Sequence, residues 1–162
     1  MYCTYYDSPL GKLLLTCAEE GLTGLYMNRE LPSKPEDHPI LRQTKQWLDA
    51  YFLGENPSAT VPLHLKGTDF QKQVWNILLT IPYGQTRTYG DIAREMAALS
   101  GKEKMSAQAV GQAVGKNLIS ILIPCHRVVG TKGQLTGYAG GLENKIRLLR
   151  QEGHRIQKDI VL

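Results

Sequence analysis

The residues of this 162-residue chain that are best suited to chemistry gather around Cys125, which is followed directly by His126 and Arg127. A cysteine at the end of an apolar segment is most often an inert core residue. Here an imidazole and a cation follow it, and such neighbours lower the pKa of a thiol from ~8.5 toward neutrality. Because the thiolate is the reactive form, this pattern indicates nucleophilic chemistry at Cys125.

A carboxylate that could assist this thiol lies near the end of a predicted C-terminal helix. Three apolar residues at helical spacing form the stripe of that helix: Leu142, Ile146 and Leu149. Gly153 ends it, so Glu152 falls in the last turn, where a negative charge opposes the helix dipole by ~0.3–1 kcal/mol. Two interpretations stay open. Either Glu152 orients His126, or it is an exposed residue offset by a nearby arginine, which the local pattern favours.

Other cysteine chemistries fit the sequence less well. Three cysteines, an odd number, make a poor disulfide framework and suit a reducing compartment. The chain has no C-x-x-C or H-x3-5-H pair, so we expect no metal site. A zinc deaminase would need a second cysteine where Val128 stands. Residues 137–141 are too short and wrongly placed for a dinucleotide fingerprint, and we expect no cofactor.

The N-terminal part of the chain alternates between strand and turn patterns. Residues 1–27 predict an antiparallel meander, and the proline-rich residues 31–39 predict a loop. A helix is expected from Ile40 to Gly54, followed by a linker over residues 55–67. No apolar run reaches the ~20 residues of a membrane span, and no signal peptide is visible. We therefore expect a cytoplasmic protein that does not contact membranes.

Beyond the linker the pattern becomes helical. Capping boxes begin at Thr68 and Thr88 and open two helices, the first of which is stopped by the Pro-Tyr-Gly of residues 82–84. Ser106 can cap a further helix over residues 107–116. This succession has helix-turn-helix spacing, although any pair of antiparallel helices would give the same signal.

The helix over residues 107–116 has an unusual composition. Gly111 and Gly115 cost up to ~1 kcal/mol each relative to alanine. Val110 and Val114 supply a narrow core stripe, and most other side chains are small. The pattern indicates either tight packing against another helix or insertion into a narrow groove of DNA.

An apolar run leads from this helix to the reactive cysteine. Residues 118–124 read Leu-Ile-Ser-Ile-Leu-Ile-Pro, a β-prone segment that ends in a rigid proline and delivers Cys125.

Charge is distributed unevenly along the chain. Residues 1–66 carry six Lys and Arg against eight Asp and Glu, a net −2. Residues 67–162 carry thirteen against seven, a net +6. The basic part suggests a polyanionic partner, and a merely solvated basic surface is an equally good interpretation of charge alone.

Residues 123–129, Ile-Pro-Cys-His-Arg-Val-Val, strongly resemble the active-site signature of the O6-alkylguanine-DNA alkyltransferases, also called methylated-DNA–protein-cysteine methyltransferases. Other family segments follow one another in order along nearly the whole chain: residues 7–12, 70–75, 81–84, 88–93, 109–111, 117, 137–138 and 140–142.

The resemblance implies a two-domain α+β fold. An N-terminal α/β domain on an antiparallel, ribonuclease H-like sheet spans residues 1–66 with the linker. A mainly helical domain with a winged-helix-like helix-turn-helix spans residues 67–162, binds DNA and carries the alkyl transfer.

The implied activity is DNA repair by direct reversal. The alkyl group of O6-alkylguanine, and of O4-alkylthymine, passes irreversibly to Cys125, so each chain reacts once. The implied partner is double-stranded DNA, bound through its minor groove with the damaged nucleotide flipped out. We expect the protein to act as a monomer.

The resemblance also implies roles for single residues. Cys125 is the nucleophile, His126 is its base through a water molecule, and Glu152 orients His126. Asn117 resembles the hinge between the recognition helix and the active-site strand. Tyr89 resembles the residue that crowds the target phosphate, promotes base flipping and donates a proton to guanine N3.

DNA contacts and a base pocket are implied in the same way. The DNA-binding residues are Tyr89 and five residues of the recognition helix: Ala107, Gln108, Ala109, Gly111 and Ala113. Gln108 stands where the family often has an arginine that fills the place of the flipped base. The base pocket comprises Val114, Val128, Tyr138, Ala139 and Gly140. Backbone groups of Cys125 and Val128 would read the base edge, and Arg127 is expected to be structural.

Two rival functions belong to other classes. A non-enzymatic damage sensor of the same fold would lack the nucleophile, and Cys125 argues against it. A transcription factor would read sequence through the helix over residues 107–116, but its glycines and alanines offer few side chains for that purpose.

Overall fold

In the computed structural model, which describes residues 1–31, 33–58 and 60–162, the chain forms two compact units. The first unit is Met1–Lys66 with Leu118–Leu122, and the second is Gly67–Asn117 with Ile123–Leu162. The short segment Leu118–Leu122 thus lies with the first unit, whereas the sequence had assigned it to the second domain. Pro32, in the expected proline-rich loop, lies outside the described residues.

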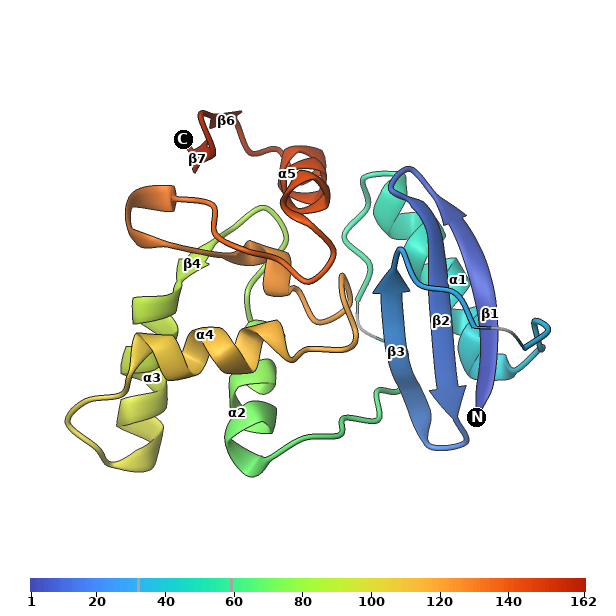
Figure 1. Cartoon of the computed structure of the whole chain (residues 1–162), viewed down its shortest axis with the longest axis horizontal. Coiled ribbons are helices and arrows are strands. Elements are labelled where there is room, and N and C mark those ends of the chain that lie inside the picture. The colour runs from blue at the N-terminus through green and yellow to red at the C-terminus, as the bar shows by residue number, and fades with distance from the viewer. Residues whose placement is uncertain (32, 59) are drawn as a thin grey trace. The chain divides into compact units, whose positions relative to one another are not determined.

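The first unit is a three-stranded antiparallel meander with one helix. Strands β1 (Tyr2–Ser8), β2 (Gly11–Ala18) and β3 (Gly21–Met27) pair in the order β1-β2-β3, and helix α1 (Pro39–Phe52) packs across all three (Figure 1). Consecutive leucines of β2 are fully buried, so both faces of this middle strand are covered. The predicted meander and helix are confirmed.

Two segments cover the free edge of β3. The amide of Leu22 donates to Pro62 O over 2.8 Å, and His64 donates back to Leu22 O over 2.9 Å. Gly21 makes this approach possible, because a Cβ there would lie 2.9 Å from the backbone of Pro62 and Leu63. Part of the predicted linker is therefore an ordered edge segment.

The second segment at this edge is the apolar run that was expected to be a strand. The Leu25 amide donates to Leu118 O over 2.9 Å, and Ile119 forms an isolated parallel bridge with Leu25. Ile121 then takes a φ of +71°, which breaks the extended conformation. The prediction of a strand over residues 118–124 is wrong, although the run is buried apart from Leu118.

The second unit begins with three helices. These are α2 (Asp69–Leu78), α3 (Tyr89–Ser100) and α4 (Ala107–Gly115), and the caps at Thr68, Thr88 and Ser106 form as predicted. Helix α2 ends at Leu78, before the Pro-Tyr-Gly expected to stop it, so the buried Ile81 lies outside the helix.

One face of α4 belongs to the core of this unit. Val110, Ala113 and Val114 are buried, and α4 packs against α2 and α3. The indole Nε1 of Trp75 in α2 donates to Ala113 O over 2.9 Å. The exposed positions of α4, by contrast, include Ala107, Gln108, Gln112 and Gly115. The helix therefore packs tightly along one side and leaves a surface of small and amide side chains on the other.

The remainder of this unit is built from short elements and one helix. The 3-10 turn η1 (Cys125–Arg127) leads into β5 (Val128–Val129), which pairs in parallel with β4 (Arg87–Thr88). The 3-10 turn η2 (Thr131–Gly133), helix α5 (Leu142–Gln151) and the hairpin of β6 (Ile156–Gln157) and β7 (Ile160–Val161) complete it.

The buried stripe of α5 differs from the predicted one. It consists of Lys145, Leu148 and Leu149, while Leu142 and Ile146 are only half-buried. Among the helices of the described residues, none is long and apolar enough to cross a membrane.

Candidate functional site

Cys125 is the first residue of η1 and is almost fully buried. Asn117, just beyond the end of α4, donates from Nδ2 to Cys125 Sγ over 3.2 Å and to Ile123 O over 3.0 Å. One side chain thus links the end of α4, the segment before η1 and the sulfur. Asn117 was expected only as a hinge residue, and the structure shows that it also donates a hydrogen bond to the candidate nucleophile.

A cavity of about 100 Å³ lies against Cys125. It brings together six residues that the sequence placed at the site: Tyr89, Gly111, Val114, Cys125, Tyr138 and Ala139. Gly115 and Gly137 also line it and were missed, although Gly115 follows Gly111 by one helical turn. Val128 and Gly140, expected in the base pocket, do not line this cavity.

The two residues absent from the cavity wall have other partners. The carbonyl of Val128 accepts a hydrogen bond from Lys145 Nζ over 2.7 Å, and its amide donates to Cys125 O. Gly140 is buried, and its carbonyl accepts from Asn144 Nδ2 over 2.9 Å. In this structure both residues therefore make hydrogen bonds next to the cavity and do not form its wall.

His126 and Glu152 form a fully buried pair. His126 Nε2 lies 2.6 Å from Glu152 Oε2. Because an ionised carboxylate can only accept, Nε2 carries the proton, and the lone pair of the neutral ring is on Nδ1. Nδ1 is buried and bonds to no described residue. The structure thus pairs His126 with Glu152 and leaves the Nδ1 atom of His126 able to accept a proton.

Glu152 is also held by Arg127 and by the backbone. Arg127 donates from Nε to Oε1 over 2.8 Å and from Nη2 to Oε2 over 3.1 Å, a two-pronged arrangement. Arg127 also donates to Ile81 O, and the Gly84 amide donates to Glu152 Oε1 over 3.1 Å. The alternative of an exposed Glu152 offset by a surface arginine is wrong, because the side chain of Glu152 is inaccessible to solvent.

The pKa values favour a neutral thiol and a neutral imidazole at rest. Burial raises the pKa of the Cys125 thiol, against the smaller lowering effects of the Asn117 hydrogen bond and the charge of Lys145. We expected the neighbours in sequence to lower this pKa. In the structure the thiol is desolvated, and the guanidinium of Arg127 is engaged by Glu152.

Burial and neighbouring charges also determine the pKa values of His126 and Glu152. Burial lowers the pKa of His126, and the hydrogen bond and charge of Glu152 only partly oppose this. For Glu152, burial alone would raise the pKa, but His126 and Arg127 together hold it well below its usual range. The carboxylate is therefore ionised throughout the neutral range, beside a neutral imidazole.

Lys145 is a residue that sequence reasoning missed. It is fully buried, bonds to Val128 O, and has a pKa lowered by burial to about 8. The thiolate form of Cys125 would favour its charged state. The only signal in the sequence was its place in α5, three residues after Leu142 and one before Ile146, next to the predicted stripe.

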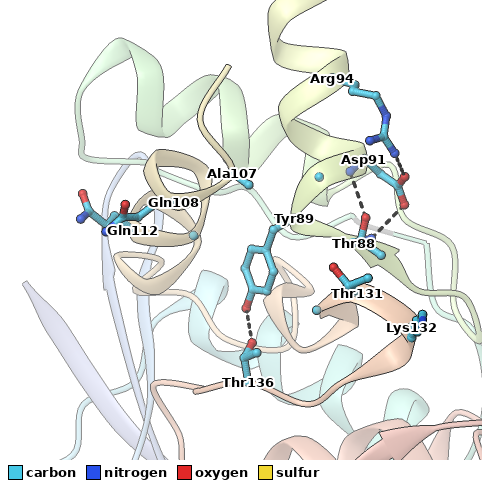
Figure 2. Close-up of a pocket in the computed structure, with 13 residues that line it drawn as sticks. Thr88, Tyr89, Asp91, Arg94, Ala107, Gln108, Gln112, Thr131, Lys132 and Thr136 are labelled. Atoms are coloured by element: carbon cyan, nitrogen blue, oxygen red, sulfur yellow. Dashed lines mark hydrogen bonds and ion pairs between the residues drawn. The ribbon is translucent and has the colours of Figure 1, made fainter. Parts of the chain in front are cut away.

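A groove of about 850 Å³ adjoins the cavity, and Tyr89 and Gly111 line both. Figure 2 shows the ring of Tyr89 between α4 on one side and the turn that carries Thr131 and Lys132 on the other. The Tyr89 hydroxyl lies 2.9 Å from Thr136 Oγ1. Burial raises the pKa of Tyr89, so its hydroxyl keeps its proton.

The residues of α4 that were predicted to bind DNA divide into two groups. Ala107, Gln108 and Gly111 line the groove, and Ala109 is half-buried. Ala113 is buried in the core against α2, which leaves no side-chain surface for a ligand. The face of α4 that lines the groove is therefore the one that carries Ala107, Gln108, Gly111 and Gln112.

Within residues 1–31, 33–58 and 60–162, no cluster of three His, Cys, Asp or Glu side chains is arranged to hold a metal ion. Cys3, Cys17 and Cys125 are all free and buried.

Comparison with known proteins adds independent information. Residues 1–65 match the family described as 6-O-methylguanine DNA methyltransferase, ribonuclease-like domain, and residues 69–154 match its DNA binding domain. The methylated-DNA–protein-cysteine methyltransferase of Mycobacterium leprae is 44% identical, covering 100% of this chain and 98% of the relative. That of Methanosarcina acetivorans is 46% identical, covering 94% and 99%.

Solved structures of such methyltransferases are also similar to this chain. The Mycobacterium tuberculosis OGT in complex with DNA is similar with a TM-score of 0.81 and 44% identity, covering 94% of this chain and 92% of that one. An O6-methylguanine DNA methyltransferase from Methanococcus jannaschii has a TM-score of 0.65 and 28% identity, covering 96% of each chain. The α+β fold is confirmed, and the chain belongs to the 6-O-methylguanine DNA methyltransferase family.

Proposed function

We propose that this protein repairs O6-alkylguanine in double-stranded DNA by transferring the alkyl group irreversibly to Cys125. The alkyl carbon on O6 is buried in the duplex, so the damaged nucleotide must be flipped into the cavity beside Cys125. Family membership and the relatives' names support the reaction, and the geometry around Cys125 supports the assignment of the nucleophile.

The pair of His126 and Glu152 supplies the base. The thiol is neutral at rest, so its proton must leave before sulfur attacks. His126 Nδ1 accepts it through one water molecule, and the ionised Glu152 stabilises the imidazolium that forms. The sulfur lone pair then forms the S–C bond, and the C–O6 bond breaks with its electron pair passing to guanine.

Tyr89 supplies the proton that guanine needs as it departs. Its hydroxyl is protonated at neutral pH and stands at the wall shared by the groove and the cavity. Donation to N3 of the base yields neutral guanine instead of an anion. The product thioether is a poor leaving group, so Cys125 is consumed and each chain repairs one lesion.

Two further side chains position and stabilise the sulfur. The Asn117 amide donates directly to Sγ, which favours the thiolate over the thiol. The buried ammonium group of Lys145 acts through its charge and ties α5 to the backbone after η1.

The exposed face of α4 fits the minor groove of DNA. Ala107 and Gly111 allow close approach, and Gln108 fills the gap that the flipped base leaves. We propose that the protein carries out this repair in the cytoplasm.

One observation carries this proposal: a buried cysteine lines a cavity while the histidine beside it is held by a buried carboxylate and keeps a bare Nδ1. A damage sensor or a transcription factor would require neither the cysteine nor the relay.

The test is the intact mass of the protein after incubation with a duplex that contains one O6-methylguanine. We expect one added methyl group, mapped to the Cys125 peptide, and none with the undamaged duplex or with Cys125→Ser. Tight binding to the damaged duplex without a mass change would instead identify a sensor, and binding that depends on sequence alone would identify a transcription factor.

A further inference from the structure

Lys132 is a cation without an ion-pair partner on the wall of the groove. It is exposed at the centre of η2, and no described residue forms an ion pair with it. The other cation of the groove, Arg94, pairs with Asp91. Lys132 therefore keeps its full charge for a ligand.

The backbone at Lys132 is unusual. Its φ of 57° and ψ of 30° lie in the left-handed region, which is unfavourable for a residue with a side chain. A glycine would avoid this cost. A lysine held in such a conformation beside a groove suggests that its side chain is used there.

The C-terminal hairpin holds this turn in place. Gly133 has a φ of +79°, and a Cβ there would lie 2.5 Å from Val161 O in β7. The Leu135 amide donates to Asp159 O over 2.8 Å, and Gln134 pairs with Ile160. The family match ends at residue 154, so the hairpin lies outside it.

The turn is also closed upon itself. Gly130 donates to Gln134 O over 2.7 Å, and Gly133 donates to Gly130 O over 3.1 Å. Hydrogen bonds within the turn and to the hairpin hold the backbone around Lys132 in place. Little conformational entropy of the backbone is therefore lost when Lys132 binds a ligand.

We propose that Lys132 binds a backbone phosphate of the DNA and that the C-terminal hairpin positions it for this contact. The inference rests on the proposed function. Tyr89 and Gly111 line both groove and cavity, so the strand whose base enters the cavity passes over the groove. Figure 2 places the Lys132 turn across Tyr89 from α4, so Lys132 engages that strand beside the flipped nucleotide.

The test measures the affinity for an undamaged duplex as a function of salt, using the full-length protein. Lys132→Ala should reduce the slope of log affinity against log salt by about 0.9, the value for one phosphate contact, and weaken binding about five-fold at 0.15 M salt. Lys132→Arg should retain the slope.

Lys102 provides the control. It is an exposed lysine just after α3, and it belongs neither to the groove nor to the C-terminal hairpin. Lys102→Ala removes the same charge from the same unit, so we expect the wild-type slope. An equal decrease in both variants would overturn the proposal, because it would indicate a general charge effect. A wild-type slope for Lys132→Ala would also overturn it.

A second variant tests the role of the hairpin. Gly133→Ala forces the turn away from Val161, so it should reproduce the slope of Lys132→Ala, and the double variant should match either single variant. An additive decrease would contradict positioning by the hairpin. Methyl transfer by wild-type protein, measured separately, shows whether any failure concerns Lys132 or the proposed function itself.

Discussion

The carboxylate of Glu152 satisfies three donors at once: the imidazole of His126, the guanidinium of Arg127 and the amide of Gly84. His126 and Arg127 are neighbours in η1, Gly84 lies in the segment after α2, and the carboxylate is shielded from water. Because a buried charge is tolerated only with such partners, Glu152 has a structural task, and the proposed reaction adds a chemical one. A substitution at this position should therefore change both stability and reactivity.

Glu152→Gln keeps the size of the side chain and removes its charge. Arg127 would be left buried without a counter-ion, so the free energy of unfolding should fall by about 3 kcal/mol. The imidazolium of His126 would lose its stabilising charge, so methyl transfer should slow at neutral pH and recover partly at alkaline pH, where the thiol ionises unaided. Chemical denaturation and single-turnover rates between pH 6 and 9 measure the two effects.

Glu143→Gln is the control for this substitution. Glu143 pairs with Arg147 on the exposed surface of α5, the helix that ends just before Glu152. Removing that pair should cost no more than ~0.5 kcal/mol and leave the pH–rate profile unchanged. If Glu152→Gln also has the wild-type profile, Glu152 has no part in activating Cys125.

The pKa shifts of His126 and Glu152 predict acid sensitivity. The pKa of His126 lies below its ordinary 6.5, so the unfolded chain binds more protons than the folded one as the pH falls through 6.5. The lowered pKa of Glu152 contributes stability above about pH 4.5 that is lost on further acidification. The free energy of unfolding should therefore decline below pH 6.5 and more steeply below 4.5.

Urea denaturation from pH 8 to pH 3 tests this expectation. In Glu152→Gln the steeper part below pH 4.5 should flatten, since the ionised carboxylate is gone. A wild-type free energy of unfolding that is constant from pH 7 to pH 4 would contradict the assignment of a buried neutral histidine and a buried carboxylate.

At the scale of elements, α4 combines a core face with a face suited to DNA. Gly111 is the position to test because it lines both groove and cavity, and a Cβ there would meet the Tyr89 ring at an ordinary 3.7 Å. In Gly111→Arg the added cation favours DNA electrostatically, so any loss of binding must be steric. We expect duplex affinity to fall about ten-fold or more, with less than ~1 kcal/mol change in stability.

Ala98→Arg, in the neighbouring helix α3, is the matched control for Gly111→Arg. Ala98 is exposed on α3 and lines neither the groove nor the cavity. It adds the same charge away from the proposed contact, so duplex affinity should remain equal or rise slightly. Binding isotherms and thermal melts compare the two variants. Undiminished affinity in Gly111→Arg would show that α4 does not enter the groove of DNA.

Local sequence signals predicted most elements because they depend on a few neighbouring residues. The caps at Thr68, Thr88 and Ser106 form because a hydroxyl and an amide three positions later lie within one turn. The run over residues 118–124 could not be resolved in this way. Its strand propensity yields to tertiary contacts that leave only Ile119 paired and turn Ile121 to a positive φ.

The candidate site was predictable where the chemistry lay in adjacent residues and unpredictable where it depended on burial. Cys125 and His126 are neighbours in a motif, whereas the burial of Lys145 arises from its contact with Val128, which no local pattern reveals. The raised thiol pKa of Cys125 has the same origin, since desolvation is a property of the packed unit.

For the protein as a whole, the proposed reaction means that each chain is consumed when it acts. Cys125 is almost fully buried, and in the proposed reaction it becomes a thioether, which is a poor leaving group. The cavity of about 100 Å³ is smaller than the ~300 Å³ of ordinary ligand pockets, so it must widen to admit a base. Such a site suits a single binding and transfer event.

The stoichiometry of repair tests whether each chain reacts once and at Cys125. A fixed amount of protein is titrated with a duplex carrying O6-methylguanine, and the restored guanine is counted after the reaction stops. We predict one guanine per chain, all transferred methyl on Cys125, and unreacted lesions remaining at every higher ratio of DNA to protein. More than one guanine per chain, or methyl on Cys3 or Cys17, would contradict the account.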